Sequence, residues 1–235
     1  MKYQGSKRRI AKEILPIILQ DRKPDQWYIE PFVGGCNMID KVDGKRIGID
    51  YNKYLISLWQ GLQDGLEYHT TINKELFSKA RDQFNGRAYY LFTDFEIGWV
   101  GFMGGFNGRF YGGGYSGQHG GRDYVQEQMN NTLKQFAKIQ NVKFFSGSYA
   151  DFNFTTPSII YCDPPYQGTK EYDTKEKFNH DLFWDWCRKQ KDNGNTIFVS
   201  EYNAPNDFKC VWSKEVKVSI RPTKTLIQTE KLFTL

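Results

Sequence analysis

Apolar residues recur every three or four positions in five stretches of the chain, with polar residues between them. This is the period of a helix that buries one face. Ser6 stands at the start of the first stretch as a candidate N-cap, and Pro16 interrupts that stretch. The pattern predicts helices over 6–20, 52–64, 73–84, 124–139 and 179–191.

Short runs of consecutive apolar residues lie between these helices. Such runs are typical of parallel strands that are buried on both faces. They predict strands over 27–32, 46–49, 142–145, 158–162 and 196–200, and two or three short strands from Phe208 to the end. Because strands and helices alternate, we predict an α/β fold with a mixed, mostly parallel sheet and helices on both faces.

Glycine is concentrated in one segment. Eleven of the 22 glycines fall between Gly98 and Gly121, so we expect no regular core element there. Aromatic, amide and guanidinium side chains stand among and just after these glycines, including Arg109, Tyr111 and Arg122. Two interpretations stay open: a compliant surface that contacts nucleic-acid bases, and a loop whose rings pack back onto the body.

Length and composition exclude several classes of protein. The 235 residues suffice for one large domain, alone or with a small insertion, and no apolar run approaches the roughly 20 residues of a membrane span. The four cysteines lack CxxC spacing and the three histidines are scattered, which argues against a disulfide scaffold and a structural zinc. With no secretory leader in the sequence, we expect a soluble, cytoplasmic protein without a metal.

The basic charge lies at the two ends of the chain. The net charge is +5, with +5 over residues 1–24, +4 over residues 209–235 and −4 between them. Attraction to a polyanion and ordinary solvated charge both account for this pattern. Aromatic residues make up 17% of the chain, so we expect some rings on a surface where bases can stack.

A glycine motif follows the strand predicted at 27–32. It reads EPFVGG from Glu30 to Gly35, and Asp50 ends the next predicted strand. Glycines let a ligand approach the backbone, and a carboxylate at the second strand accepts hydrogen bonds from ribose hydroxyls. The motif therefore indicates a nucleotide-type cofactor site, with a plain turn as the alternative.

A second motif, DPPY, covers Asp163 to Tyr166 directly after the strand predicted at 158–162. The two prolines have no backbone N–H, which leaves a site rich in hydrogen-bond acceptors. An amino group with two hydrogens matches it, since the Asp163 carboxylate and the Pro164 carbonyl can accept one each. Tyr166 then offers a ring face to the attached base. The alternative is a turn at the end of a strand.

The order of these motifs resembles the Dam-type DNA N6-adenine methyltransferases over nearly the whole chain. The matching segments are KYQGSK (Lys2 to Lys7), EPFVGG, Asp50, SYAD (Ser148 to Asp151) and CDPPY (Cys162 to Tyr166). The resemblance implies a Rossmann-like fold that uses S-adenosylmethionine. It also implies methyl transfer to N6 of an adenine flipped out of double-stranded DNA.

Residue roles follow from the resemblance position by position. It implies S-adenosylmethionine contacts for Tyr3, Lys7, Phe32, Gly34, Asp50 and Asp163. It places the adenine against Asp163, Pro164, Pro165 and Tyr166, and DNA contacts at Arg109, Tyr111 and Arg122. We expect residues 1–60 and 140–235 to form the catalytic domain and residues 61–139 an inserted target-recognition region. Cys36 replaces the last glycine of the family's FxGxG pattern, which we expect to weaken cofactor binding.

Other functions stay open at this point. The DPPY chemistry needs only an exocyclic amine, so N4 of cytosine or an amino group in RNA is an alternative target. A catalytically silent DNA-binding relative would keep the same fold. A protein-glutamine methyltransferase has a similar site, but with Asn where this chain has Asp163.

Overall fold

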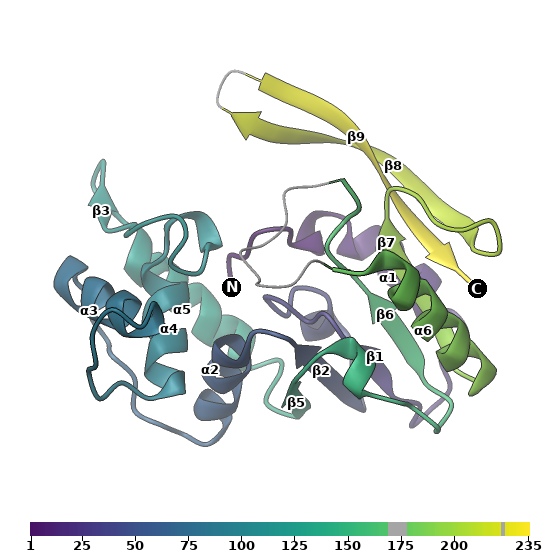
Figure 1. Cartoon of the computed structure of the whole chain (residues 1–235), viewed down its shortest axis with the longest axis horizontal. Coiled ribbons are helices and arrows are strands. Elements are labelled where there is room, and N and C mark those ends of the chain that lie inside the picture. Colours follow the sequence, from purple (N-terminus) through teal and green to yellow (C-terminus); the bar gives the residue numbers. More distant parts are fainter. Residues whose placement is uncertain (169–177, 222–223) are drawn as a thin grey trace. The chain divides into compact units, whose positions relative to one another are not determined.

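The computed structural model describes residues 1–168, 178–221 and 224–235, and only the backbone within 217–226 (Figure 1). The chain divides into two compact units. The first comprises Met1–Ala11 and Val33–Gly147, and the second comprises Lys12–Phe32 and Ser148–Leu235.

The first unit contains a parallel pair of strands, β2 (Arg46–Asp50) and β5 (Val142–Ser146). Their register pairs Arg46 with Val142 and Asp50 with Ser146, so both strands end at the same edge. Helix α2 (Lys53–Gln63) packs against both strands, and Trp59 of this helix is stacked on Phe144 of β5. This arrangement places Asp50 at the carboxyl edge of a buried strand pair, as the sequence predicts.

Three further helices complete the first unit, and α4, at the centre of this group in Figure 1, packs against α2 and against the other two. Side chains that accept backbone N–H groups cap all four helices, which explains why each begins where it does. The three are α3 (Lys74–Phe84), α4 (Asp94–Gly104) and α5 (Tyr124–Phe136), and the caps of α2 to α5 are Asn52, Asn73, Thr93 and Asp123.

Helix α4 corrects the expectation that the Gly-rich segment forms no regular core element. Its residues from Phe95 to Gly104 are buried except Glu96. A Cβ at Gly98 would lie 2.1 Å from the backbone oxygen of Tyr54, and one at Gly101 would lie 2.5 Å from the Phe110 ring. Glycine here lets neighbouring elements approach the helix closely. Packing outweighs the low helix propensity of glycine.

The rest of the Gly-rich segment is irregular. It contains a single 3-10 turn, Phe106–Gly108, and a small hairpin of β3 (Gln118–His119) and β4 (Arg122–Asp123). Gly108, Gly114, Gly117, Gly120 and Gly121 have positive φ, which only glycine adopts without strain. The expectation that no regular core element forms in this segment is therefore wrong up to Gly104, and after Gly104 it agrees with the structure.

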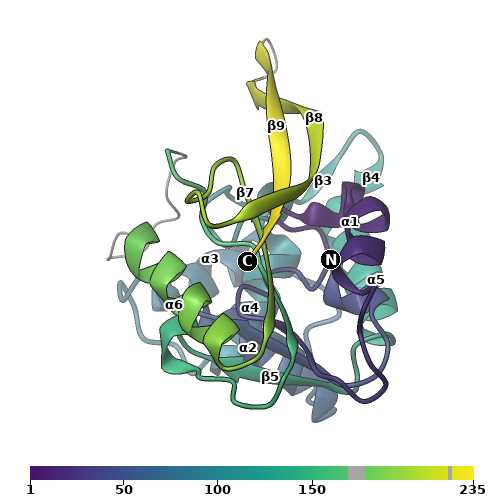
Figure 2. The same cartoon turned by 90° about the vertical axis from the view of Figure 1, so that its right-hand side faces the viewer.

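The second unit has three parallel strands in the order β1 (Tyr28–Glu30), β6 (Ile159–Cys162) and β7 (Thr196–Glu201). The antiparallel strands β9 (Lys224–Thr234) and β8 (Lys209–Arg221) follow beyond β7. Figure 2 shows α1 (Ala11–Ile18) and α6 (His180–Asp192) on opposite sides of these strands. Mostly parallel strands between helices confirm the predicted α/β class.

Two further elements differ from the prediction. The helix expected over 6–20 is a 3-10 turn at Lys7–Arg9, capped by Ser6, followed by α1. The short strands expected after Phe208 are two long strands of 13 and 11 residues. Only the end of β9, from Lys231 to Thr234, pairs with β7. The rest of the two strands does not need the apolar pattern of a buried strand, and polar residues there made the strands look short in the sequence. No helix in the described ranges is both long and apolar enough to cross a membrane.

Candidate active site

The first group of candidate residues surrounds the glycine loop, Val33–Cys36, in the first unit. The loop runs alongside the end of β2, since the Val33 N–H donates to the Ile49 carbonyl at 2.8 Å. Gly34 has a φ of 47°, and its N–H donates to Oδ2 of Asp50 at 2.9 Å. The Asn52 N–H donates to the other carboxylate oxygen, also at 2.9 Å. Backbone amides thus hold Asp50 from both sides.

The environment of Asp50 suits a ligand that carries hydroxyl groups. Burial raises the pKa of this carboxyl above its ordinary value, while the hydrogen bonds from Asn52 and Gly34 act in the opposite direction. The side chain is half-buried, and each carboxylate oxygen that accepts one amide can accept a further hydrogen bond. A ribose diol fits this donor requirement, so the residues present suit a nucleoside cofactor.

Tyr3 explains the two glycines of the motif in a way that sequence reasoning missed. A Cβ at Gly34 would lie 2.9 Å from Cε1 of Tyr3, and one at Gly35 would lie 2.5 Å from its Cβ. The glycines therefore admit the Tyr3 side chain itself. Lys7 is half-buried nearby in the sequence, and its Nζ donates to the Gly5 carbonyl at 3.4 Å. We call Tyr3, Gly34, Gly35 and Asp50 the glycine-loop site.

Cys36 occupies the position of the missing glycine with a glycine-like backbone. Its φ is 56°, in the left-handed region, and the residue is fully buried. A non-glycine residue held there costs about 1–3 kcal/mol. The departure from FxGxG thus changes the side chain while the loop keeps the conformation that glycine would favour.

Sequence reasoning also missed two glutamines of α5 that contact this region. Gln128 forms two hydrogen bonds with the backbone of Lys2, and Gln135 donates to the carbonyls of Gly35 and Cys36. Both lie on the buried face of an amphipathic helix, beside Val125 and Met129. A polar residue at a buried position of the helical pattern is the signal that could have identified them.

The second group of candidate residues follows β6 in the second unit. Asp163 is the first residue after this strand, which lies between β1 and β7. Pro164 is buried, whereas Asp163, Pro165 and Tyr166 are half-buried. The strand therefore ends in a short acceptor-rich segment in which Pro164 is buried and the other three residues are partly exposed to solvent.

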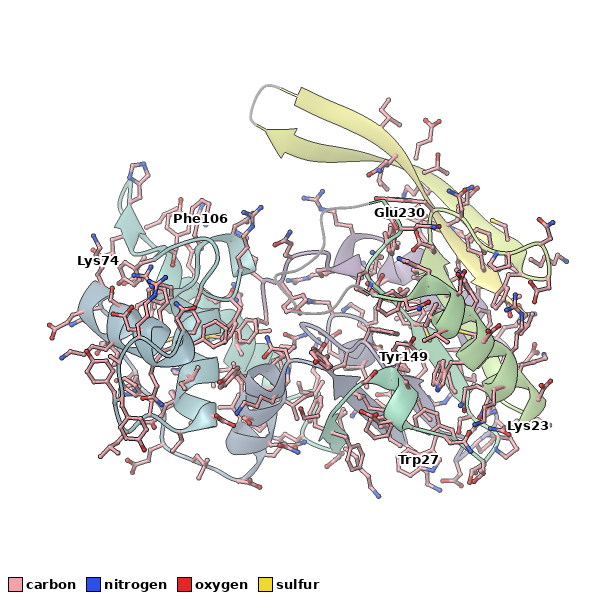
Figure 3. The ribbon with its side chains drawn as sticks, in the orientation of Figure 1. Lys23, Trp27, Lys74, Phe106, Tyr149 and Glu230 are labelled. Atoms are coloured by element: carbon pink, nitrogen blue, oxygen red, sulfur yellow. The ribbon has the colours of Figure 1, made fainter. Side chains whose placement is uncertain are left out.

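Tyr166 of this segment and Tyr202, which follows β7, both form hydrogen bonds with strand β9. The Tyr166 hydroxyl donates to Oε2 of Glu230 at 2.8 Å, and the Tyr202 hydroxyl donates to Oε1 of Gln228 at 2.7 Å. The two rings meet edge to face, with centroids 4.6 Å apart. Figure 3 labels Glu230 on this strand. Gln228 and Glu230 lie two residues apart and so share one face of β9.

Glu201, at the end of β7, joins the same network. It is 1% exposed, and its two oxygens accept the N–H groups of Gln167 at 3.0 Å and Tyr202 at 2.7 Å. Burial, followed by the carboxylates of Glu230 and Glu201, raises the pKa of Tyr202 to about 12. Tyr202 therefore keeps its proton, and we call Asp163–Tyr166 with Glu201, Tyr202, Gln228 and Glu230 the DPPY site.

Phe32 lies in an aromatic cluster of the second unit. Its ring centroid is 5.4 Å from that of Tyr149, 5.9 Å from Phe178 and 5.7 Å from Phe183. Tyr149, labelled in Figure 3, belongs to the SYAD segment. This packing explains why an aromatic residue precedes the glycine loop, and the half-buried Phe32 ring keeps part of its surface open.

The three residues expected to contact DNA lie in different environments. Arg109 is exposed, and Arg122 is exposed with its guanidinium paired to Glu127 at 2.8 and 2.7 Å. Tyr111 is only 6% exposed, and its hydroxyl donates to the Ile97 carbonyl at 2.9 Å. The Tyr111 ring is therefore part of the core. In the described part of the chain no group of His, Cys, Asp and Glu could hold a metal ion.

Comparison with solved structures returned distant likenesses. The chain aligns over 96% of its length with a candidate RNA methyltransferase, PH1948 from Pyrococcus horikoshii, covering 83% of that chain at 10% identity and a TM-score of 0.45. It also aligns over 96% of its length with a candidate methyltransferase, yhhF from Escherichia coli, covering 84% of that chain at 12% identity and a TM-score of 0.38. The alignment with SMU.472, a candidate methyltransferase complexed with SAH, covers 100% of this chain and 54% of that chain, at 10% identity and a TM-score of 0.39.

Comparison with curated protein sequences returned no match. The family model of the D12 class N6 adenine-specific DNA methyltransferases, in contrast, matches residues 3–234. This match spans both units and includes the glycine loop and the DPPY segment. The chain belongs to the D12 class N6 adenine-specific DNA methyltransferase family, whose members use S-adenosylmethionine.

Proposed function

We propose that the glycine-loop site binds S-adenosylmethionine. Asp50 accepts hydrogen bonds from the ribose, Gly34 makes room for the Tyr3 ring beside the cofactor, and Tyr3 and Lys7 contact the cofactor. Phe32 and Asp163 of the second unit are proposed as further cofactor contacts. Support comes from the half-buried Asp50 carboxylate, whose oxygens are oriented by the amides of Gly34 and Asn52.

The DPPY site is proposed to hold the target adenine. The Asp163 carboxylate and the Pro164 carbonyl accept the two hydrogens of the exocyclic amino group, and Pro165 stiffens the segment. Tyr166 stacks on the base, and its hydroxyl bond to Glu230 limits rotation of the ring. Tyr202, edge to face with Tyr166, is a further wall for the base.

The chemistry follows from these roles. The lone pair of the adenine amino group is delocalised into the ring, which makes the nitrogen a poor nucleophile. Acceptors on both hydrogens draw the nitrogen toward tetrahedral geometry and restore its lone pair. S-adenosylmethionine supplies, when bound, an electrophilic methyl group on a sulfonium sulfur. Catalysis then comes from positioning and fixed dipoles, and none of the four cysteines needs to act as a nucleophile.

The substrate is proposed to be double-stranded DNA from which one adenine is flipped out. Flipping costs a few kcal/mol, which stacking on Tyr166 and contacts with the DNA backbone offset. Arg109 and Arg122, both exposed, are proposed as DNA contacts, whereas the buried Tyr111 is proposed to have a core role. In domain terms, residues 1–60 and 140–235 perform catalysis and residues 61–139 recognise the target.

One observation carries this proposal: β6 ends directly in a half-buried carboxylate followed by two residues without N–H donors. Methylation-sensitive sequencing of DNA from cells that express the chain tests it. We expect N6-methyladenine within one short sequence context, and much less of it in cells that express Asp163→Ala at the same level. Unmodified DNA in both cultures, with the wild-type protein folded, would contradict the proposal.

A further inference from the structure

Two buried glutamines lie on one face of helix α5. Gln128 is 7% exposed and Gln135 is 6% exposed. They are seven residues apart, which is two helical turns, so their side chains leave the helix on the same side. A buried amide is stabilising only where its donors and acceptors are satisfied. The hydrogen-bond partners of these two amides therefore show which parts of the structure the glutamines hold in place.

Gln128 fixes the segment that carries Tyr3. Its Oε1 accepts the Lys2 N–H at 3.1 Å, and its Nε2 donates to the Lys2 carbonyl at 3.0 Å. This reciprocal pair binds one residue of backbone as a neighbouring strand would. Because Lys2 is bonded covalently to Tyr3, the amide determines where the Tyr3 side chain enters the glycine loop.

Gln135 fixes the glycine loop itself. Its Nε2 donates to the carbonyl oxygens of Gly35 at 3.0 Å and Cys36 at 2.9 Å, and lies 3.2 Å from Oδ2 of Asp40. These carbonyls flank the residue that has the left-handed φ of 56°. A strained backbone persists only where its surroundings hold it. Gln135 supplies hydrogen bonds of that kind.

We propose that Gln128 and Gln135 are positioning residues for S-adenosylmethionine, which hold Tyr3 and the glycine loop from one helix face. The inference rests on the proposed cofactor role of the glycine-loop site. Neither glutamine belongs to the motifs that suggest that role, and both lie in the region 61–139 expected to serve target recognition. Helix α5 thus contributes to cofactor binding from within the recognition region.

The test replaces each glutamine by Met, which keeps the length and the apolar stem but removes the amide. Gln135→Met leaves two buried carbonyls without this donor, so fewer molecules hold the loop in its binding conformation. We expect the Kd for S-adenosylmethionine, measured by calorimetry, to rise about tenfold. The KM for S-adenosylmethionine should rise equally, with kcat at saturating cofactor and the affinity for DNA unchanged. Gln126→Met, on the exposed face of the same helix, is the matched control.

A purely structural role would give a different result. The melting temperature of the ligand-free protein would fall, while the Kd of the folded protein stayed within about twofold of the wild-type value. That outcome would overturn the inference. Where Gln135→Met fails to fold, Gln128→Met provides the same comparison through the Tyr3 segment.

Asp50→Ala, measured alongside, separates this inference from the proposed function. Weakened binding in Asp50→Ala with unchanged binding in both glutamine variants would reject only the role of α5. Unchanged binding in Asp50→Ala would reject the proposed cofactor site, and the inference with it.

Discussion

The glycine-loop site and the DPPY site differ in the interactions that hold their residues in place. In the first, backbone conformation and close approach dominate, because Gly34 and Gly35 admit Tyr3, and backbone amides orient Asp50. In the second, side chains hold side chains, as Glu230 and Gln228 fix two tyrosine hydroxyls. The glycine-loop site should therefore be sensitive to a single added methyl group, and the DPPY site to the loss of a single functional group.

Removal of the Asp163 carboxylate should have the largest effect. Asp163→Ala takes away one of the two acceptors for the amino group, and we expect methyl transfer to slow by about 10²–10³-fold or more. The Kd for S-adenosylmethionine should change much less than the rate. Single-turnover transfer and calorimetry measure the two quantities. Asp181→Ala, an exposed carboxylate of the same unit, is the control and should retain full activity.

Asp50→Ala should produce the opposite pattern. Loss of the carboxylate that accepts the ribose hydroxyls should raise the Kd for S-adenosylmethionine about 10–100-fold, since hydrogen bonds to charged groups are the strong ones. DNA binding in a gel-shift assay should stay at the wild-type level. Asp64→Ala, exposed at the end of α2, is the control. Equal losses of cofactor and DNA affinity would break the comparison between the two sites.

Gly35→Ala tests whether shape governs the glycine-loop site. The new Cβ would lie 2.5 Å from the Tyr3 Cβ and 2.7 Å from Nδ2 of Asn37, so the Tyr3 segment must shift. We expect a loss of about 1–3 kcal/mol in the free energy of unfolding, together with weaker cofactor binding. Gly112→Ala, whose Cβ would meet only one atom at 3.6 Å, should be nearly neutral. Thermal melting and calorimetry distinguish the two variants.

Cys36→Gly should have the smallest effect. Release of the left-handed strain offsets the lost burial and the greater entropy of an unfolded glycine, so the free energy of unfolding should change by less than about 1 kcal/mol. Cys187→Gly makes the same chemical change at a buried helical position and should cost about 2 kcal/mol. Similar losses in both variants would show that the φ of Cys36 carries no strain.

Much of this architecture could be predicted from local patterns. Apolar periodicity identified helices α2, α3, α5 and α6, and the apolar runs identified the strands that end at Asp50 and Cys162. Helix α4 could not be predicted, because glycine disfavours a helix unless neighbouring elements need its small size, as Tyr54 and Phe110 do. That requirement exists only in the folded chain.

The candidate sites show the same division. The motifs give Asp50 and Asp163 because Asp50 ends one strand and Asp163 directly follows another, and these positions can be read from the sequence. The supporting contacts join residues that are far apart in the sequence. Gln135 lies 100 positions from Gly35, and Glu230 lies 64 positions from Tyr166. Such pairs depend on tertiary structure. Gln135 leaves an indirect signal, a polar residue at a buried position of the helical pattern.

The most direct test of the account is the identity of the methylated base. The purified protein is incubated with duplex DNA and methyl-labelled S-adenosylmethionine, and the DNA is digested to nucleosides for mass analysis. We expect the label to appear as N6-methyladenine and its initial rate of incorporation to fall by about 10²-fold or more in Asp163→Ala. Label in N4-methylcytosine, or full labelling of adenine by the Asp163→Ala protein, would contradict it.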